Sequence, residues 1–277
     1  MNCNTEILPD KLAGVRKLPA RYIEKIWGRD TLPAAFPALE GKRIGEIWFK
    51  PPPELPQLLV KYLFTSEKLS VQVHPPAEAS PTGRGKEECW LILDAEPGAK
   101  LAMGFTREVS ADEMRAAALD GAIEDLLHWR EVSAGDFFYI PAGTVHAIGA
   151  GLTLLEVQEN TDITYRLYDY GRPRELHLSE GLKVAKGLPY PDDLARTIPV
   201  DCELMLVDGP RFTLAQVIGR PSQDIASRFT GTVQVMPLSG SVAIGNSRVE
   251  PGQSAFADTL GDIAFDDSAR VMIARAA

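Results

Sequence analysis

Short runs of apolar residues, alternating with polar ones and separated by proline and glycine, make up most of this chain. Four such runs lie in the first hundred residues, at 46–50, 58–64, 70–74 and 89–93. Runs of this length that are rich in Val, Ile, Phe, Trp and Tyr and end at turn residues are typical of β-strands. The pattern returns in GDFFYIP, HAIGAGLTLLEVQE and DITYRLYDYG. We therefore predict an antiparallel β-sandwich or barrel.

One segment departs from the strand pattern and predicts a helix at residues 110–130. Its apolar residues recur at helical spacing, and Ser110 followed by Glu113 is typical of a capping box at a helix N-terminus. His128 falls in the last turn of this predicted helix, where the helix dipole favours a cation. We therefore assign His128 a structural role.

A domain boundary is predicted at residues 187–200, where GLPYPDDLARTIPV is rich in proline and aspartate and lacks an apolar period. It would separate a domain of residues 1–190 from a smaller one of residues 201–277. The apolar pattern of the second domain again predicts only β-strands, and its turns repeat the pattern of the first domain. It contains no histidine, so we predict a degenerate β-domain without a metal site.

Composition excludes several classes of protein. Of the 277 residues, 45% are hydrophobic and 24% are charged, which is ordinary for a globular protein. Without a long apolar run or a signal-peptide pattern, we expect a cytoplasmic protein that does not bind membranes. A net charge of −9 speaks against nucleic acid. The cysteines, Cys3, Cys89 and Cys202, are expected to be reduced, and Cys89 should pack in the core because alternation directs it away from Glu88.

Side chains suited to bind a metal recur in the predicted strands. Gln72 and His74 share one face of their strand, and Lys86 and Glu88 share a face in the next run. His146 follows a Pro-x-Gly turn that can aim it back into a sheet. Two imidazoles, a carboxylate and an amide form a mixed set of ligands that Zn²⁺ or another divalent transition metal accepts. We predict a metal site here.

Polar residues also line one face of a later strand. Glu156, Gln158 and Asn160 alternate with apolar residues, which indicates either a wet barrel interior or an exposed sheet face. His177 precedes a helix that we predict to begin near Ser179, so we expect it to make local hydrogen bonds and not to bind a metal.

Five phrases of the sequence resemble, in this order, those of the type I mannose-6-phosphate isomerases in their short bacterial form: LSVQVHPP, GKEECWLIL, GDFFYIPAGTVHAIGAG, LLEVQENTDITYRLYDYGR and PRELHL. The resemblance implies a mainly β fold, with a cupin-type jelly-roll barrel that carries a short helical insertion and is followed by the smaller β-domain. It also implies one Zn²⁺ per chain, or another divalent metal. The loop PPAEASPTGRG between His74 and Lys86 looks shorter than is usual in the family, which leaves open any substrate contact from it.

The resemblance assigns roles to individual residues. Arg166 matches the catalytic arginine of the family, and Lys86 matches a residue of the substrate site. The positions that match the metal ligands are Gln72, His74, Glu88 and His146.

Cations gather near these motifs in spite of the negative net charge. We predict that Lys86, Arg172 and Arg174 help to hold the phosphate of a small substrate, and that Glu156 also contacts this substrate. Arg84 lies nearby as well. For the three arginines at 84, 172 and 174, a solvated surface position explains the sequence equally well.

These observations predict a metal-dependent aldose–ketose isomerase that interconverts mannose 6-phosphate and fructose 6-phosphate. The metal and Arg166 would stabilise an enediolate, while Lys86, Glu156 and a metal-bound hydroxide remain open as the base. Two alternatives are a cupin dioxygenase with non-haem iron and a non-catalytic sugar-binding cupin module. Lys86 and Arg166 favour the isomerase, because a dioxygenase acting on a neutral substrate needs no cations beside its metal. The oligomeric state stays open.

Overall fold

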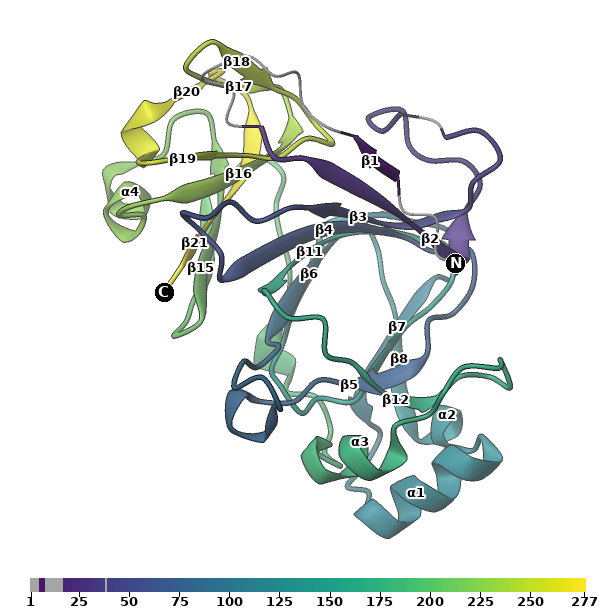
Figure 1. Ribbon diagram of the computed structural model, residues 1–277. Coiled ribbons are helices and arrows are strands. Elements are labelled where there is room, and N and C mark those ends of the chain that lie inside the picture. Colours follow the sequence, from purple (N-terminus) through teal and green to yellow (C-terminus); the bar gives the residue numbers. More distant parts are fainter. Residues whose placement is uncertain (1–4, 8–16, 38) are drawn as a thin grey trace. The chain divides into compact units, whose positions relative to one another are not determined.

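The computed structural model describes residues 5–7, 17–37 and 39–277 of the chain. Strands dominate these residues, so the prediction of a mainly β protein is confirmed (Figure 1). The chain divides into two compact units. The central unit consists of Lys25–Arg29 and Tyr62–Thr197, and the terminal unit consists of Met1–Glu24, Asp30–Lys61 and Ile198–Ala277.

The central unit contains two antiparallel sheets. One has the strand order β11-β6-β9-β13, and the other has the order β12-β5-β10-β7-β8. The strands of the first sheet are β6 (Glu88–Ala95), β9 (Asp136–Ile140), β11 (Leu152–Glu159) and β13 (Ala195–Thr197). Those of the second are β5 (Val71–Val73), β7 (Lys100–Phe105), β8 (Leu127–Glu131), β10 (His146–Ile148) and β12 (Tyr165–Tyr168).

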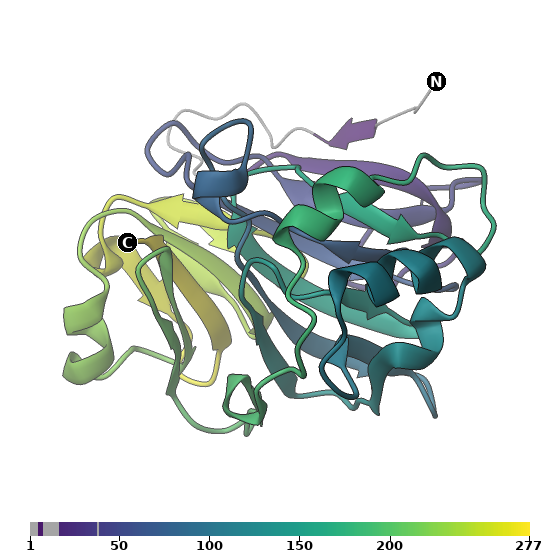
Figure 2. The ribbon, with the colours of Figure 1, turned by 90° about the horizontal axis from the view of Figure 1, so that it is seen from below.

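Strand alternation in the central unit directs one set of side chains into a core shared by both sheets. Trp90 and Ile92 of β6 pack there with Leu101 and Met103 of β7 and with Phe138 of β9. A separate cluster of buried residues lies on the other face of the second sheet. That face is covered by α1 (Ala111–Asp120), α2 (Ile123–Leu126) and α3 (Leu178–Val184), of which α1 and α3 contact each other and β12 (Figure 2).

The helical insertion is shorter than predicted. Ser110 Oγ accepts a hydrogen bond from Glu113 N at 3.2 Å, but the Glu113 carboxylate pairs with Arg107, so only half of a capping box forms. The prediction that His128 ends a helix is wrong, because residues 127–131 form β8. Pairing with β7 and burial of Leu127 outweigh the helical period of this segment.

The terminal unit is also built mainly from strands. Its sheets have the orders β14-β15-β21-β16-β19 and β18-β17-β20, and β1-β2-β3 are hydrogen-bonded in that order. A short helix, α4 (Gln223–Arg228), corrects the expectation that this part is entirely β. The strands near the N-terminus are β1 (Thr5–Ile7), β2 (Ala20–Arg29), β3 (Ile44–Phe49) and β4 (Leu58–Phe64), of which Lys25–Arg29 of β2 and residues 62–64 of β4 belong to the central unit. The later ones are β14 (Leu204–Asp208), β15 (Phe212–Ile218), β16 (Val233–Ser239), β17 (Val242–Ile244), β18 (Ser247–Val249), β19 (Ala255–Ala257), β20 (Ile263–Phe265) and β21 (Arg270–Ala276). Among the described residues, the 3-10 helices are η3 (Leu260–Asp262) in this unit and η1 (Ala77–Ala79) and η2 (Asp192–Leu194) in the central unit.

The two units divide the chain differently from the predicted domains 1–190 and 201–277. Leu18 N donates a hydrogen bond to Ser254 O at 2.8 Å, so a segment near the N-terminus joins the C-terminal strands. Such a remote pairing leaves no local trace in the sequence. Separate folding of residues 1–190 stays a prediction. In the part of the chain that the structure describes, no helix could span a membrane.

Gly149, in the phrase HAIGAG, marks a point where two strand ends of the central unit meet closely. Its backbone N donates to Lys100 O at 2.9 Å, and its carbonyl accepts from Thr65 Oγ1 at 2.7 Å. A Cβ atom at this position would lie 2.3 Å from Lys100 O. The backbone therefore leaves no room for a side chain.

We expect Gly149→Ala to lower the free energy of unfolding by about 1–3 kcal/mol, the usual cost of forcing a methyl group into a packed site. Urea unfolding measures this change. Gly261→Ala is the control, because its Cβ would make only an ordinary contact at 3.5 Å. Equal stability of the two variants would contradict the tight packing.

Candidate metal centre

His74, Glu88 and His146 bring three donor atoms together between the two sheets of the central unit. His74 directly follows β5, His146 begins β10, and Glu88 begins β6 in the opposite sheet. His74 Nε2 lies 3.5 Å from Glu88 Oε2, and His146 Nε2 lies 3.5 Å from Glu88 Oε1. The three side chains are 2%, 1% and 0% exposed, respectively. They form the one group of this kind found among the described residues.

Strand register explains why side chains so distant in sequence converge. His146 pairs with Gln72 on one side and with Met103 on the other, and directly paired residues project to the same face of a sheet. Met103 belongs to the core between the sheets, whereas Ala147 packs on the helix-covered face. Alternation therefore directs the imidazole of His146 inward, toward the strand that carries Glu88.

Hydrogen bonds to backbone carbonyls orient both imidazoles. His74 Nδ1 lies 2.9 Å from Ile163 O, and His146 Nδ1 lies 2.9 Å from Thr144 O. A carbonyl oxygen only accepts, so each Nδ1 carries the proton and each Nε2 of the neutral ring carries a lone pair. Histidines that bind metals are commonly held in this way.

The electrostatics of the cluster produce the protonation states that a metal requires. Burial and the ammonium of Lys86 lower the pKa of His74 to about 4, although Glu88 opposes this shift. Burial also lowers the pKa of His146. For Glu88, burial alone would raise the pKa, but Lys86, His74 and His146 hold it well below its usual range. Two neutral imidazoles and an ionised carboxylate therefore face one another at neutral pH.

The donor geometry fits a small divalent cation. Ligands bound tetrahedrally at 2.0–2.1 Å are about 3.3 Å apart, close to the 3.5 Å separations found here. Both oxygens of Glu88 are buried; Oε2 pairs with Lys86 Nζ at 2.9 Å, and Oε1 makes no hydrogen bond to the described residues. A buried carboxylate in this condition is suited to a cation, and two imidazoles with one carboxylate suit Zn²⁺ and related metals.

Gln72 and Lys86 lie at the edge of this cluster. Gln72 Nε2 is 3.2 Å from His146 Nε2, and its Oε1 accepts a hydrogen bond from Ser70 Oγ. Since His146 Nε2 carries a lone pair, the amide of Gln72 donates to it, and ligation through Oε1 would need the amide to turn over. Lys86 Nζ is 2.9 Å from His74 Nε2 and 2.9 Å from Glu88 Oε2. Lys86 is therefore a buried cation beside the predicted ligands.

The predicted arginines lie around β12. Arg166 pairs with Gln72, so it starts from the same sheet face as the metal cluster, and its Nη1 donates to Glu175 O at 2.6 Å. Arg174 makes a bidentate ion pair with the buried Asp169, and Arg172 also contacts this carboxylate. The structure does not bring Arg172 or Arg174 to the metal cluster, and Arg84 is exposed.

Further predicted positions have clear structural surroundings. Glu156 is buried and accepts a hydrogen bond from Trp90 Nε1 at 3.2 Å. Trp90 packs edge-on against His146, with 5.3 Å between ring centroids. Cys89 is buried beside Val157 O, so its predicted core packing is confirmed.

His177 makes a hydrogen bond, as expected, but not a local one: its Nδ1 accepts from Arg166 N on β12 at 3.1 Å. The carbonyls of Ile163 and Thr144 were not foreseen from the sequence. Every residue has a backbone carbonyl, so the sequence does not show which carbonyls will contact a histidine. Only the contact of Thr144 with His146 is hinted at, because these residues are close in the chain.

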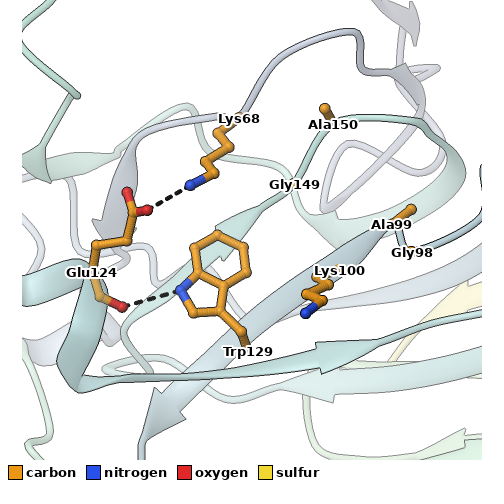
Figure 3. A pocket seen from close by; sticks show the side chains of 8 residues that line it. All are labelled: Lys68, Gly98, Ala99, Lys100, Glu124, Trp129, Gly149 and Ala150. Carbon is orange, nitrogen blue, oxygen red and sulfur yellow. Dashed lines mark hydrogen bonds and ion pairs between the residues drawn. The ribbon is translucent and has the colours of Figure 1, made fainter.

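A pocket of about 380 Å³ lies elsewhere in the central unit (Figure 3). Trp129 forms one wall, and its Nε1 donates to Glu124 O, while Lys68 pairs with the carboxylate of Glu124. Trp129 is in register with Ala102, which packs on the helix-covered face of the sheet. The pocket is therefore separate from the metal cluster.

Comparison with known proteins identifies the family of this chain. No family model matches it. A curated mannose-6-phosphate isomerase of Streptococcus mutans is 35% identical over 223 residues, covering 74% of this chain and 66% of that protein. Mannose-6-phosphate isomerase ManA of Bacillus subtilis is 39% identical over 165 residues, or 52% of each chain. The chain belongs to the mannose-6-phosphate isomerase family.

Solved structures named for this family have the same fold. A mannose 6-phosphate isomerase from Bacillus subtilis matches with a TM-score of 0.71 and 23% identity, over 94% of this chain and 98% of that one. A phosphomannose isomerase from Salmonella typhimurium matches with a TM-score of 0.73 and 16% identity, over 94% and 99%. The predicted cupin-type jelly roll is thereby confirmed. By sequence, the chain spans about half the length of three curated isomerases of the family, at 52%, 51% and 45%.

We expect His74→Ala, Glu88→Ala and His146→Ala each to lose bound metal, because three protein ligands are close to the minimum for a catalytic divalent site. Metal content of each folded variant, measured by mass spectrometry, checks this. Gln72→Ala should weaken metal binding without abolishing it.

His177→Ala is the matched control, since His177 bonds to Arg166 N and not to the cluster. Full metal content in any of the three ligand variants would remove that residue from the ligand set.

Stability of the protein stripped of metal by a chelator should depend on pH through His74. Its pKa of about 4 in the folded protein lies below the ordinary 6.5, so the unfolded chain takes up the proton first. Stability should therefore fall as the pH drops from about 6.5 toward about 4, by on the order of 2 kcal/mol at pH 5. Urea unfolding at a series of pH values, compared with His74→Gln, measures this contribution. An unchanged slope in His74→Gln would contradict it.

Proposed function

We propose that the protein is a Zn²⁺-dependent isomerase that interconverts mannose 6-phosphate and fructose 6-phosphate. The observation that carries this proposal is the buried cluster of His74, Glu88 and His146, in a chain that belongs to a family named for this activity. Gln72 is proposed as a fourth, weaker ligand. Zn²⁺ would be one ion per chain, and the cytoplasm remains the predicted location.

When bound, the metal would supply Lewis-acid polarisation of the sugar oxygens. The side chains of the cluster would hold it with one formal negative charge, from Glu88. The carbonyls of Ile163 and Thr144 orient the two imidazoles, so that each Nε2 would be free to bind the metal. With the metal bound, these buried side chains would form a preorganised cationic centre, where charge is stabilised more strongly than in bulk solvent.

Arg166 is proposed as the residue that stabilises the enediolate. Aldose–ketose isomerisation moves a proton between C1 and C2 and builds negative charge on the adjacent oxygens. The guanidinium group keeps its positive charge. Arg166 is paired with Gln72 on the neighbouring strand, about 5 Å away, and lies on the same face of the sheet. Its contribution would therefore appear along the reaction path rather than in substrate binding.

Lys86 and Glu156 are the protein groups proposed to move the proton or to contact the substrate. Both are buried, and Lys86 lies directly beside the proposed ligands His74 and Glu88. Glu156 accepts a hydrogen bond from Trp90 Nε1, and Trp90 packs in the core between the two sheets, on the side of the metal cluster. Lys86 accepts a proton only in its neutral form, so the pH dependence of kcat in Lys86→Ala and in Glu156→Ala distinguishes the two candidates.

The phosphate of the substrate is proposed to bind near Arg172 and Arg174, with Lys86 as a further cation. Asp169 compensates only one of the two arginine charges, so this segment keeps a net positive charge. Among the described residues, Arg172 Nη1 and Arg166 Nε are buried without a hydrogen-bond partner. Such donors suit a phosphate oxygen.

The protein loaded with Zn²⁺ should convert mannose 6-phosphate into fructose 6-phosphate in a coupled assay. Arg166→Ala should keep its metal but lose on the order of a hundredfold in kcat, as is usual when one donor to a developing oxyanion is removed. The exposed Arg84, changed to alanine, is the control.

A change confined to KM would instead give Arg166 a phosphate-binding role. Near-normal activity of Arg166→Ala would contradict the proposed mechanism. Absence of turnover in the Zn²⁺-loaded wild type would overturn the proposed function.

A further inference from the structure

The segment that carries Lys86 and Glu88 is held in place by a residue outside the metal cluster. Glu159, the last residue of β11, accepts a hydrogen bond from Glu87 N through its Oε2 at 2.9 Å. Its own backbone N donates to Glu87 O at 3.0 Å. The backbone N–H and C=O of Glu87 are therefore both bonded to Glu159. Glu87 lies between Lys86 and Glu88, whose side chains face the metal cluster.

Little free space surrounds this contact. A Cβ atom on Gly85 would lie 2.9 Å from Ala77 N and 3.1 Å from Glu159 Oε2. Lys86 N also donates to Pro75 O at 3.1 Å. The turn that enters β6 is thus fixed between the Glu159 carboxylate and the chain that follows His74.

The neighbouring residue holds the other side of the cluster. Gln158 is fully buried, and its Nε2 donates to Glu159 O at 2.7 Å and to Thr161 O at 2.8 Å. These bonds fix the bend after β11, which continues to Ile163. The carbonyl of Ile163 is the partner of His74 Nδ1.

We propose that Glu159 and Gln158 are positioning residues of the metal centre. Glu159 sets the place of Lys86 and Glu88, and Gln158 sets the bend whose carbonyl orients His74. The end of β11 thereby supports one ligand from each sheet without touching the metal. This inference rests on the proposed function, since it assumes that the cluster binds Zn²⁺.

The test compares two carboxylates that each accept a hydrogen bond from a backbone N–H group, one in the central unit and one in the terminal unit. Glu159 Oε2 accepts from Glu87 N, and Glu203 Oε2 accepts from Ser222 N at 3.0 Å. Zn²⁺ affinity is measured by competition with a chromophoric chelator for the wild type, Glu159→Ala, Glu159→Gln and Glu203→Ala. Thermal unfolding of the four proteins without metal measures their general stability.

We expect Glu159→Ala to weaken Zn²⁺ binding by about 10- to 100-fold, the range typical for loss of an outer-shell contact. Glu159→Gln keeps an oxygen acceptor for Glu87 N and should stay within about threefold of the wild type by the same measure. Glu203→Ala should leave Zn²⁺ affinity unchanged, while its melting temperature falls as for any lost hydrogen bond.

A second variant tests the other half of the proposal. Gln158→Glu replaces the Nε2 donor by an acceptor in the same volume, and it should also weaken Zn²⁺ binding by about tenfold or more. Wild-type affinity in both Glu159→Ala and Gln158→Glu would overturn the inference, as would an equal loss in Glu159→Ala and Glu203→Ala. If the wild type itself binds no Zn²⁺, the proposed function fails, and this result is distinct from either of those.

Discussion

The central unit is organised around one buried negative charge. Glu88 is 1% exposed, and its carboxylate lies between two sheets, where desolvation of an ion costs several kcal/mol unless other charges compensate. Lys86 provides part of this compensation at 2.9 Å. Two imidazoles aim their lone pairs at the same carboxylate, an arrangement that favours a further cation between them. The histidines stay neutral because burial and Lys86 outweigh the opposing effect of this carboxylate on their pKa values.

Alternation along single strands was enough to predict most of the cluster from the sequence. The pairs Gln72 with His74 and Lys86 with Glu88 each share a face by counting residues, and His146 follows a turn that reverses the chain. The same method failed for His128, because an apolar pattern compatible with a helix was overridden by pairing of residues 127–131 with β7. Local periodicity reports which face a side chain takes, but it does not report which strand will pair.

The periodicity of single strands also does not report contacts with other parts of the chain, near or distant. Leu18 joins Ser254 across most of the chain, so the predicted boundaries could not show that the N-terminal residues group with the C-terminal strands. Arg172 and Arg174 were chosen for their charge, yet both turn to Asp169, a partner only three to five residues away. An internal carboxylate of this kind competes with any external anion, and sequence spacing alone does not reveal which of them a guanidinium contacts.

The partners of the two proposed histidine ligands are main-chain oxygens. Where a carboxylate side chain holds such an imidazole, replacing that one residue removes the contact. Here the oxygens of residues 144 and 163 would remain after nearly any substitution at those two positions, provided that the course of the chain is kept. The orientation of the two imidazoles therefore depends on the shape of two loops rather than on the side chains at positions 144 and 163.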